Sequence, residues 1–154
     1  WQATGDLRWL KERGFPTIAE LAQFWASRVD SAGDGTYSIR HTMSPDEYHD
    51  NCTNPPYTVA VARIALMAAF DLAPLVGVDP NATFARIARG LPLLYDAGLD
   101  YHPEHVGYAP HERIKQADVV MLGYPLMVDM PESTKANDLR LYANATDPDG
   151  PGMT

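Results

Sequence analysis

The chain has 154 residues, of which 45% are hydrophobic and 21% charged, and its 20 acidic side chains outnumber 12 basic ones. This length suits one domain of ordinary size, and the net charge of -8 argues against nucleic acid or an anionic membrane as a partner. One cysteine, Cys52, excludes an internal disulfide framework, and we expect its thiol to be a small buried side chain.

The N-terminal part of the chain predicts two helices. Residues 5–13 place leucines among alternating charges, and Gly14 is expected to end this first, short helix. The run from Thr17 to Glu20 has the capping-box pattern, so a second helix is expected to begin there. Its apolar side chains follow helical spacing and should form one buried face, made of Ile18, Leu21, Ala22, Trp25 and Val29.

A turn, a strand and a loop are expected next. Residues 31–35 are rich in turn formers, and residues 36–42 alternate loosely, which predicts half of a hairpin. Residues 43–56 should be a loop, because Pro45 biases the preceding residue away from the helical conformation. We call residues 43–56 the acid loop.

A long helix is predicted for residues 57–76, and it is apolar on nearly every side. Its length matches a membrane span, but it carries Arg63 and Asp71. Central charges cost roughly 2.5–3.5 kcal/mol each in a bilayer, so we favour an inner helix of a large helical fold.

The remaining chain predicts three more helices and two loops. Helices are expected over residues 80–88, 114–122 and 131–145, the last with Leu139 and Tyr142 facing inward. The segments between and after them, residues 90–113 and 147–154, read as loops. Consecutive helices with one small hairpin predict an all-α, that is mainly α-helical, fold.

The acid loop holds the main candidates for catalysis. Asp46 and Glu47 are adjacent and are followed by Tyr48 and His49. Two carboxyl groups in one loop can have their pKa values pushed apart, which acid–base catalysis requires. By themselves these residues fit a solvated acidic turn better than a catalytic site, because acidic clusters point to function only in a fraction of cases.

A second polar group suggests a metal site. His102, Glu104, His105 and His111 lie in the loop of residues 90–113. The prolines there and the absence of helical histidine spacing weaken this interpretation, so we expect no metal.

Several motifs, in this order along the chain, resemble glycoside hydrolase family 65. They are Ser44-Pro45-Asp46-Glu47-Tyr48-His49, Tyr57-Thr58 at the head of the apolar helix, and Ile114-Lys115-Gln116-Ala117-Asp118-Val119-Val120. The segment from Trp1 to Val29 resembles the part of the family that leads into the acid loop. The run Gly150-Pro151-Gly152-Met153-Thr154 resembles the one before the last catalytic region. The resemblance covers nearly the whole chain, and it is nearer to the hydroxylysine-glucoside hydrolases and acid trehalases than to the disaccharide phosphorylases.

The resemblance implies a fold and a domain organisation. The family has a six-hairpin (α/α)6 barrel, and we expect a short hairpin immediately before the acid loop. Residues 1–154 are then expected to be an internal fragment of one catalytic domain, incomplete at both ends.

The resemblance also implies roles for the candidate residues. Glu47 matches the general acid that protonates the glycosidic oxygen, and Asp46 is expected to orient the loop or to bond sugar hydroxyls. Lys115 and Gln116 match a pair that hydrogen-bonds the cleaved glucose, which suits their donors and acceptor. Glu47 and this pair should open onto one concave surface about one sugar length apart. Four further residues are expected to line the same pocket, namely Tyr48, His49, Asn54 and Tyr57.

The implied reaction is inverting hydrolysis of an α-glucosidic bond, in a glucosyl-galactosyl-hydroxylysine or a trehalose-like disaccharide. The base is expected beyond Thr154, and no cofactor is implied. Two alternatives stay open, namely a disaccharide phosphorylase and a non-catalytic carbohydrate-binding or structural fragment. The family usually has Asn where this chain has Val59, and other residues where Pro55 and Pro56 stand, which bears on substrate detail.

Compartment and oligomeric state stay open. Three N-glycosylation acceptor patterns begin at Asn51, Asn81 and Asn144, and they hint at secretion. Coincidence in polar segments explains them at least as well.

Overall fold

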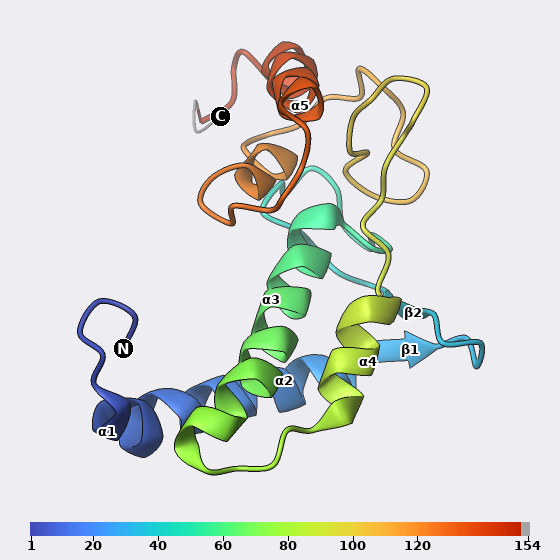
Figure 1. Cartoon of the computed structure of the whole chain (residues 1–154). Helices are drawn as coiled ribbons and strands as arrows, with labels where there is room; N and C mark the ends of the chain where they lie inside the picture. The colour runs from blue at the N-terminus through green and yellow to red at the C-terminus, as the bar shows by residue number, and fades with distance from the viewer. Residues whose placement is uncertain (152–154) are drawn as a thin grey trace. The chain divides into compact units, whose positions relative to one another are not determined.

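The computed structural model describes residues 1–151, and these are mainly helical, with one two-stranded sheet (Figure 1). The predicted all-α class is therefore confirmed at this level. Contacts within the chain divide it into two compact units. The first comprises residues 1–37 and 62–91, and the second comprises residues 38–61 and the chain from residue 92 onward.

The first unit begins with one continuous helical run. It comprises α1 (Leu7–Trp9), a π-helical turn (Leu10–Gly14) and α2 (Phe15–Arg28). Asp6 caps this run, because its side chain accepts a 2.9 Å hydrogen bond from the Trp9 N–H. The two predicted helices are thus one helical run.

The predicted stop at Gly14 and the predicted start at Thr17 are both wrong. Gly14 has helical dihedral angles, and a Cβ atom there would lie 2.8 Å from the Trp9 ring, so the glycine allows a side chain to pack closely. Thr17 donates to the carbonyl of Arg13, four residues back, as a threonine inside a helix does. The π-helical turn ends two residues before Pro16, which has no N–H to give to the helix. The predicted apolar face is only partly covered, since Ala22 is fully buried whereas Leu21 is 49% exposed.

The predicted hairpin is confirmed, in a shorter form. Strands β1 (Val29–Ser31) and β2 (Tyr37–Ile39) pair in a two-stranded sheet. The second strand ends at Ile39 because His41 has a left-handed backbone, with φ of 54°.

The long apolar helix is confirmed. Helix α3 spans Pro56–Leu72, and a 3₁₀ turn (Ala73–Val76) extends it to a left-handed cap at Gly77. The stretch Pro56–Val76 is long and apolar enough to cross a bilayer, a property that it shares with core helices of globular proteins. Helix α4 (Ala82–Gly90) follows; Asn81 caps it by accepting from the Thr83 N–H at 3.0 Å.

The second unit contains the long loop from residue 92 to residue 113, a 3₁₀ turn (Val119–Leu122) and α5 (Glu132–Ala145). The predicted α-helix over residues 114–122 is wrong. Ile114 forms an isolated parallel bridge with Thr146, and Asp118 has dihedral angles outside the helical region. Only the last four residues of that segment are helical.

The buried face of α5 also differs from the expectation. Tyr142 is fully buried, as predicted, whereas Leu139 is 53% exposed. Asp138 faces inward, because its carboxylate accepts hydrogen bonds from the backbone and from Nδ1 of His102, each at 2.8 Å. The core of this unit consists of Ala60, Tyr101, Tyr108, Ile114, Val119, Leu122, Tyr142 and Ala145.

Candidate active site

The acid loop is a loop, as predicted, and its two ends are fastened to each other. Thr42 and Cys52 form an antiparallel bridge, with hydrogen bonds of 3.2 and 2.8 Å between their backbones. Asn54 donates its N–H to the carbonyl of Ile39, and its side chain accepts from the Ile39 N–H, both at 2.8 Å. Cys52 is buried, as expected. The loop therefore leaves and re-enters the fold at one fixed place.

Asp46 anchors the loop from inside. Its side chain is fully buried, and one carboxylate oxygen accepts a 2.6 Å hydrogen bond from the backbone N–H of Lys115. The other oxygen lies 2.7 Å from Nδ1 of His49. The backbone N–H of Asp46 donates to a carboxylate oxygen of Asp118 at 3.1 Å. Of the two roles expected for Asp46, this environment matches orientation of the loop.

Glu47, the next residue, points the other way. Its side chain is 54% exposed and forms an ion pair with the ammonium group of Lys115. The hydrogen bond to Glu47 raises the pKa of Lys115, so the ammonium stays charged. Gln116 donates its side-chain amide to the carbonyl of Pro45. The structure thus brings Glu47 and the Lys115–Gln116 pair together across a long sequence separation.

The predicted gap of about one sugar length between Glu47 and Lys115 is wrong. Asp46 accepts a hydrogen bond from the backbone N–H of Lys115. This brings the side chain of Glu47, the next residue, into contact with the side chain of Lys115. Lys115 and Gln116 lie in a bend, since the helix on which they were expected does not form.

Tyr48 extends the site toward the segment after α5. Its hydroxyl donates to Asp147 at 2.9 Å, and Arg113 contacts the other oxygen of the same carboxylate at 3.0 Å. A hydrogen bond from the backbone N–H of Asp149, together with those from Tyr48 and Arg113, lowers the pKa of Asp147. The bond to Asp147 raises the pKa of Tyr48. Asp147 was not a sequence-based candidate, because it follows a helix far from the acid loop.

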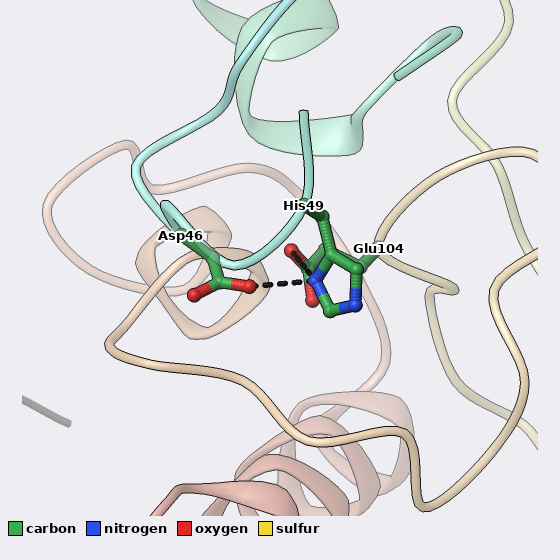
Figure 2. A group of neighbouring side chains, drawn as sticks. All are labelled: Asp46, His49 and Glu104. Carbon is green, nitrogen blue, oxygen red and sulfur yellow. Dashed lines mark hydrogen bonds and ion pairs between the residues drawn. The ribbon is translucent and has the colours of Figure 1, made fainter. Parts of the chain in front are cut away.

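His49 is mostly buried and joins a group of acidic side chains. Figure 2 shows one nitrogen of its ring facing the carboxyl groups of both Asp46 and Glu104. Nδ1 lies 2.7 Å from Asp46 and 3.3 Å from Glu104, and Nε2 lies 3.3 Å from Glu112. Burial, with neighbouring carboxylates, raises the pKa of Glu104 to about 9, and burial raises that of Asp118 to about 6.

The ligand atoms of Asp46, His49 and Glu104 lie within 4.8 Å of one another, close enough to share one metal ion. The 2.7 Å contact between His49 and Asp46 has the length of a hydrogen bond. This contact occupies the ring nitrogen, so we read Asp46 and His49 as a hydrogen-bonded pair with the carboxyl group of Glu104 beside it.

The histidine motif that suggested a metal site is divided by the fold. His102 bonds to Asp138, and His105 packs against His49 with ring centroids 5.1 Å apart. His111 is exposed, with φ of 78°. Glu104 is the carboxylate residue of this motif, and it lies against His49 of the acid loop. Its burial could not be read from a sequence in which it stands between two histidines.

Asn54 and Tyr57 were also expected to line the pocket. The amide of Asn54 is used by the hairpin, and Tyr57 is half-buried in the first turn of α3. No hydrogen bond among residues 1–151 joins either of them to Glu47. Val59 is fully buried and both prolines before Tyr57 are buried, so these departures from the family pattern face the interior. Asp118, which the Lys115–Gln116 motif contains, is, like Asp147, a residue in contact with the acid loop that sequence reasoning did not single out.

Known proteins similar to this chain are glycoside-cleaving enzymes. A protein-glucosylgalactosylhydroxylysine glucosidase from Dictyostelium discoideum is 40% identical over 155 residues, which cover 98% of this chain and 22% of that protein. A kojibiose hydrolase from Flavobacterium johnsoniae is 35% identical over 158 residues, which cover 100% of this chain and 23% of that protein. The chain thus spans about a fifth of the length of these curated relatives.

A solved structure has the same fold. A candidate kojibiose phosphorylase from the human microbiome matches with a TM-score of 0.80 at 16% sequence identity, over 96% of this chain and 25% of that one. The family model for the glycosyl hydrolase family 65 central catalytic domain matches residues 1–82, which include the hairpin, the acid loop and α3. This chain therefore belongs to glycosyl hydrolase family 65.

Proposed function

We propose that this chain is part of an inverting α-glucoside hydrolase in which Glu47 is the general acid. One observation carries the proposal: an exposed carboxyl group sits beside a lysine, on a loop that a buried network holds in place. An acid of this kind can reach a substrate from solvent and still keep a defined position.

The chemistry divides the work between two carboxyl groups. Glu47 donates a proton to the glycosidic oxygen as the bond to the anomeric carbon breaks. In an inverting mechanism, a second carboxylate about 6.5–9.5 Å away activates water on the opposite face of the sugar. We propose that this base lies outside the chain, beyond Thr154.

The substrate contacts are proposed for side chains at the open end of the site. Lys115 and Gln116 carry donors that sugar hydroxyls can take over from Glu47 and from the carbonyl of Pro45. Tyr48 is half-exposed beside them. We assign the buried Asp46, His49 and Asn54 to the support of the loop instead.

The names of the relatives support an α-glucoside as the substrate class. The hydroxylysine-linked disaccharide is our first candidate, and kojibiose and trehalose are the others. We further propose that residues 1–154 form part of one (α/α)6 barrel domain, a proposal that the similarity to a solved structure over 96% of the chain supports.

A phosphorylase is the second candidate function. The solved structure that shares the fold is described as a kojibiose phosphorylase, and the two reactions differ only in whether water or phosphate attacks the anomeric carbon. The same general acid serves both.

The test uses the full-length protein that contains this chain. It is incubated with each candidate disaccharide, with and without phosphate, and the products are followed by NMR. We expect the cleaved glucose unit to appear first as the β anomer, with no dependence on phosphate. Glucose 1-phosphate would establish the phosphorylase. With the glucosyl-galactose disaccharide, whose only glucose is the cleaved one, initial release of α-glucose would exclude inversion.

A further inference from the structure

Glu104 is a buried carboxyl group without a hydrogen-bond donor. Its residue is 1% exposed, and neither carboxyl oxygen has a hydrogen-bond partner within the part of the chain that the structure describes. Its nearest polar neighbour is Nδ1 of His49, 3.3 Å from one oxygen. Figure 2 shows the group directed at His49 and Asp46.

A count of protons decides the charge of this group. Nδ1 of His49 carries at most one hydrogen, and Asp46, at 2.7 Å, is better placed to accept it. Glu104 is then left as a buried carboxyl with no donor. An ionised carboxylate in that position costs several kcal/mol, whereas the protonated acid can itself donate.

The charges around Glu104 favour the same state. The ionisable groups that face it are Asp46, His49, Cys52, Tyr108, Glu112 and Asp118. Asp118, Asp46 and Glu112 disfavour a negative charge on Glu104 by repulsion, whereas the raised pKa values of Cys52 and Tyr108 keep those two groups neutral. Burial contributes most to the raised pKa of about 9, followed by the charges of Asp118 and Asp46.

We propose that Glu104 is a protonated, neutral carboxylic acid that donates a hydrogen bond into the Asp46–His49 pair and so positions the acid loop. The inference rests on the proposed role of Glu47. Asp46 is the residue before Glu47 and holds the backbone of Lys115. Glu104 is thus a positioning residue, which acts on the general acid through Asp46.

Two substitutions distinguish a neutral Glu104 that donates a hydrogen bond from an ionised Glu104. Glu104→Gln keeps the shape and a donor but has no charge, whereas Glu104→Met fills the space and cannot donate. In the full-length protein, we expect the Gln variant to keep kcat within about threefold, because a neutral donor is all that is needed. The Met variant should lose about 10–100-fold in kcat with little change in KM, since a small displacement of the acid impairs the reaction more than binding.

A spectroscopic measurement tests the proton without relying on activity. Near pH 7.5, Asp118 is mostly ionised and Glu104 is protonated, given pKa values of about 6 and about 9. The infrared difference spectrum between the wild type and Glu104→Gln should then show the carbonyl stretch of a protonated carboxylic acid in the wild type.

The outcomes separate the two proposals. Absence of the infrared band, equal loss of kcat in the Gln and Met variants, or a bound metal ion that Glu104→Gln releases would each overturn the neutral acid. If the wild type releases no sugar from any α-glucoside, the proposed function fails. The infrared band would still decide the protonation of Glu104.

Discussion

The carboxylate of Asp46 accepts a 2.6 Å hydrogen bond from the backbone N–H of Lys115, 69 residues further along the chain. Asp118 completes the connection, because it accepts from the N–H of Asp46. The acid loop and the bend that carries Lys115 are therefore joined by buried polar contacts. This connection explains how Glu47 and Lys115 meet at the surface.

The first prediction concerns Asp46→Asn in the full-length protein. The amide can keep the bond to Lys115 but loses the charge that faces His49, so Glu47 should shift. We expect kcat to fall by about 10–100-fold with a small change in KM, and the free energy of unfolding to fall by about 1–3 kcal/mol. Asp50→Asn, at an exposed position in the same loop, is the matched control and should behave as the wild type. A higher KM with unchanged kcat would instead indicate that Asp46 binds the sugar.

The second prediction concerns Glu47→Gln. Removal of the acid should lower kcat by about 10²–10⁴-fold on a natural disaccharide, whose leaving group needs a proton. An aryl glucoside with an acidic phenol should be affected much less. The control is Glu20→Gln on the exposed side of α2. Equal losses on both substrates would show that Glu47 only binds.

Sequence patterns predicted the fold well where local signals act alone. The hairpin, α3 and α4 were found, because turn residues, apolar runs and caps define them. The break at Gly14 was wrong because the glycine serves contact with Trp9, and the helix at residues 114–122 was wrong because Ile114 pairs with Thr146. Both errors come from contacts that a local pattern does not contain.

The sequence predicted which residues form the site better than it predicted whether each of them is buried or exposed. The motifs named Asp46, Glu47 and Lys115, and the structure brings these residues together. Adjacent residues in a loop can face opposite ways, so the sequence did not show that Asp46 is buried while Glu47 is exposed. Glu104 became recognisable only when the fold placed it against His49.

The third prediction tests the Glu47–Lys115 pair. Both side chains are partly exposed, so their ion pair should contribute less than about 1 kcal/mol to stability. Lys115→Met should therefore leave the unfolding transition nearly unchanged but lower kcat/KM. In a double variant with Glu47→Gln, the losses should be less than multiplicative, because both residues act at one step. Multiplicative losses would mean that the two residues act independently.

The fourth prediction concerns stability in the second unit. Asp138 is buried and accepts two hydrogen bonds from His102. Asp138→Ala leaves both donors unsatisfied and should lower the free energy of unfolding by about 3 kcal/mol. Asp138→Asn keeps an acceptor and should cost less than half as much. Asp79→Ala, at an exposed site, should change stability by less than about 0.5 kcal/mol, and urea unfolding measures all three.

The last prediction concerns the pH dependence of stability. In the folded chain the pKa of Glu104 is raised from 4.5 to about 9 and that of Asp118 from 3.8 to about 6, so the folded state holds protons that the unfolded chain releases. The contribution of both groups is complete below about pH 4 and is lost as the pH rises through the folded pKa values, so stability should fall from about pH 4 to about pH 9. In Glu104→Gln only the Asp118 part remains, so the decline above about pH 6 should be smaller than in the wild type. Urea unfolding of both proteins at pH values across this range measures the difference. Parallel curves would show that Glu104 does not hold its proton in the folded state.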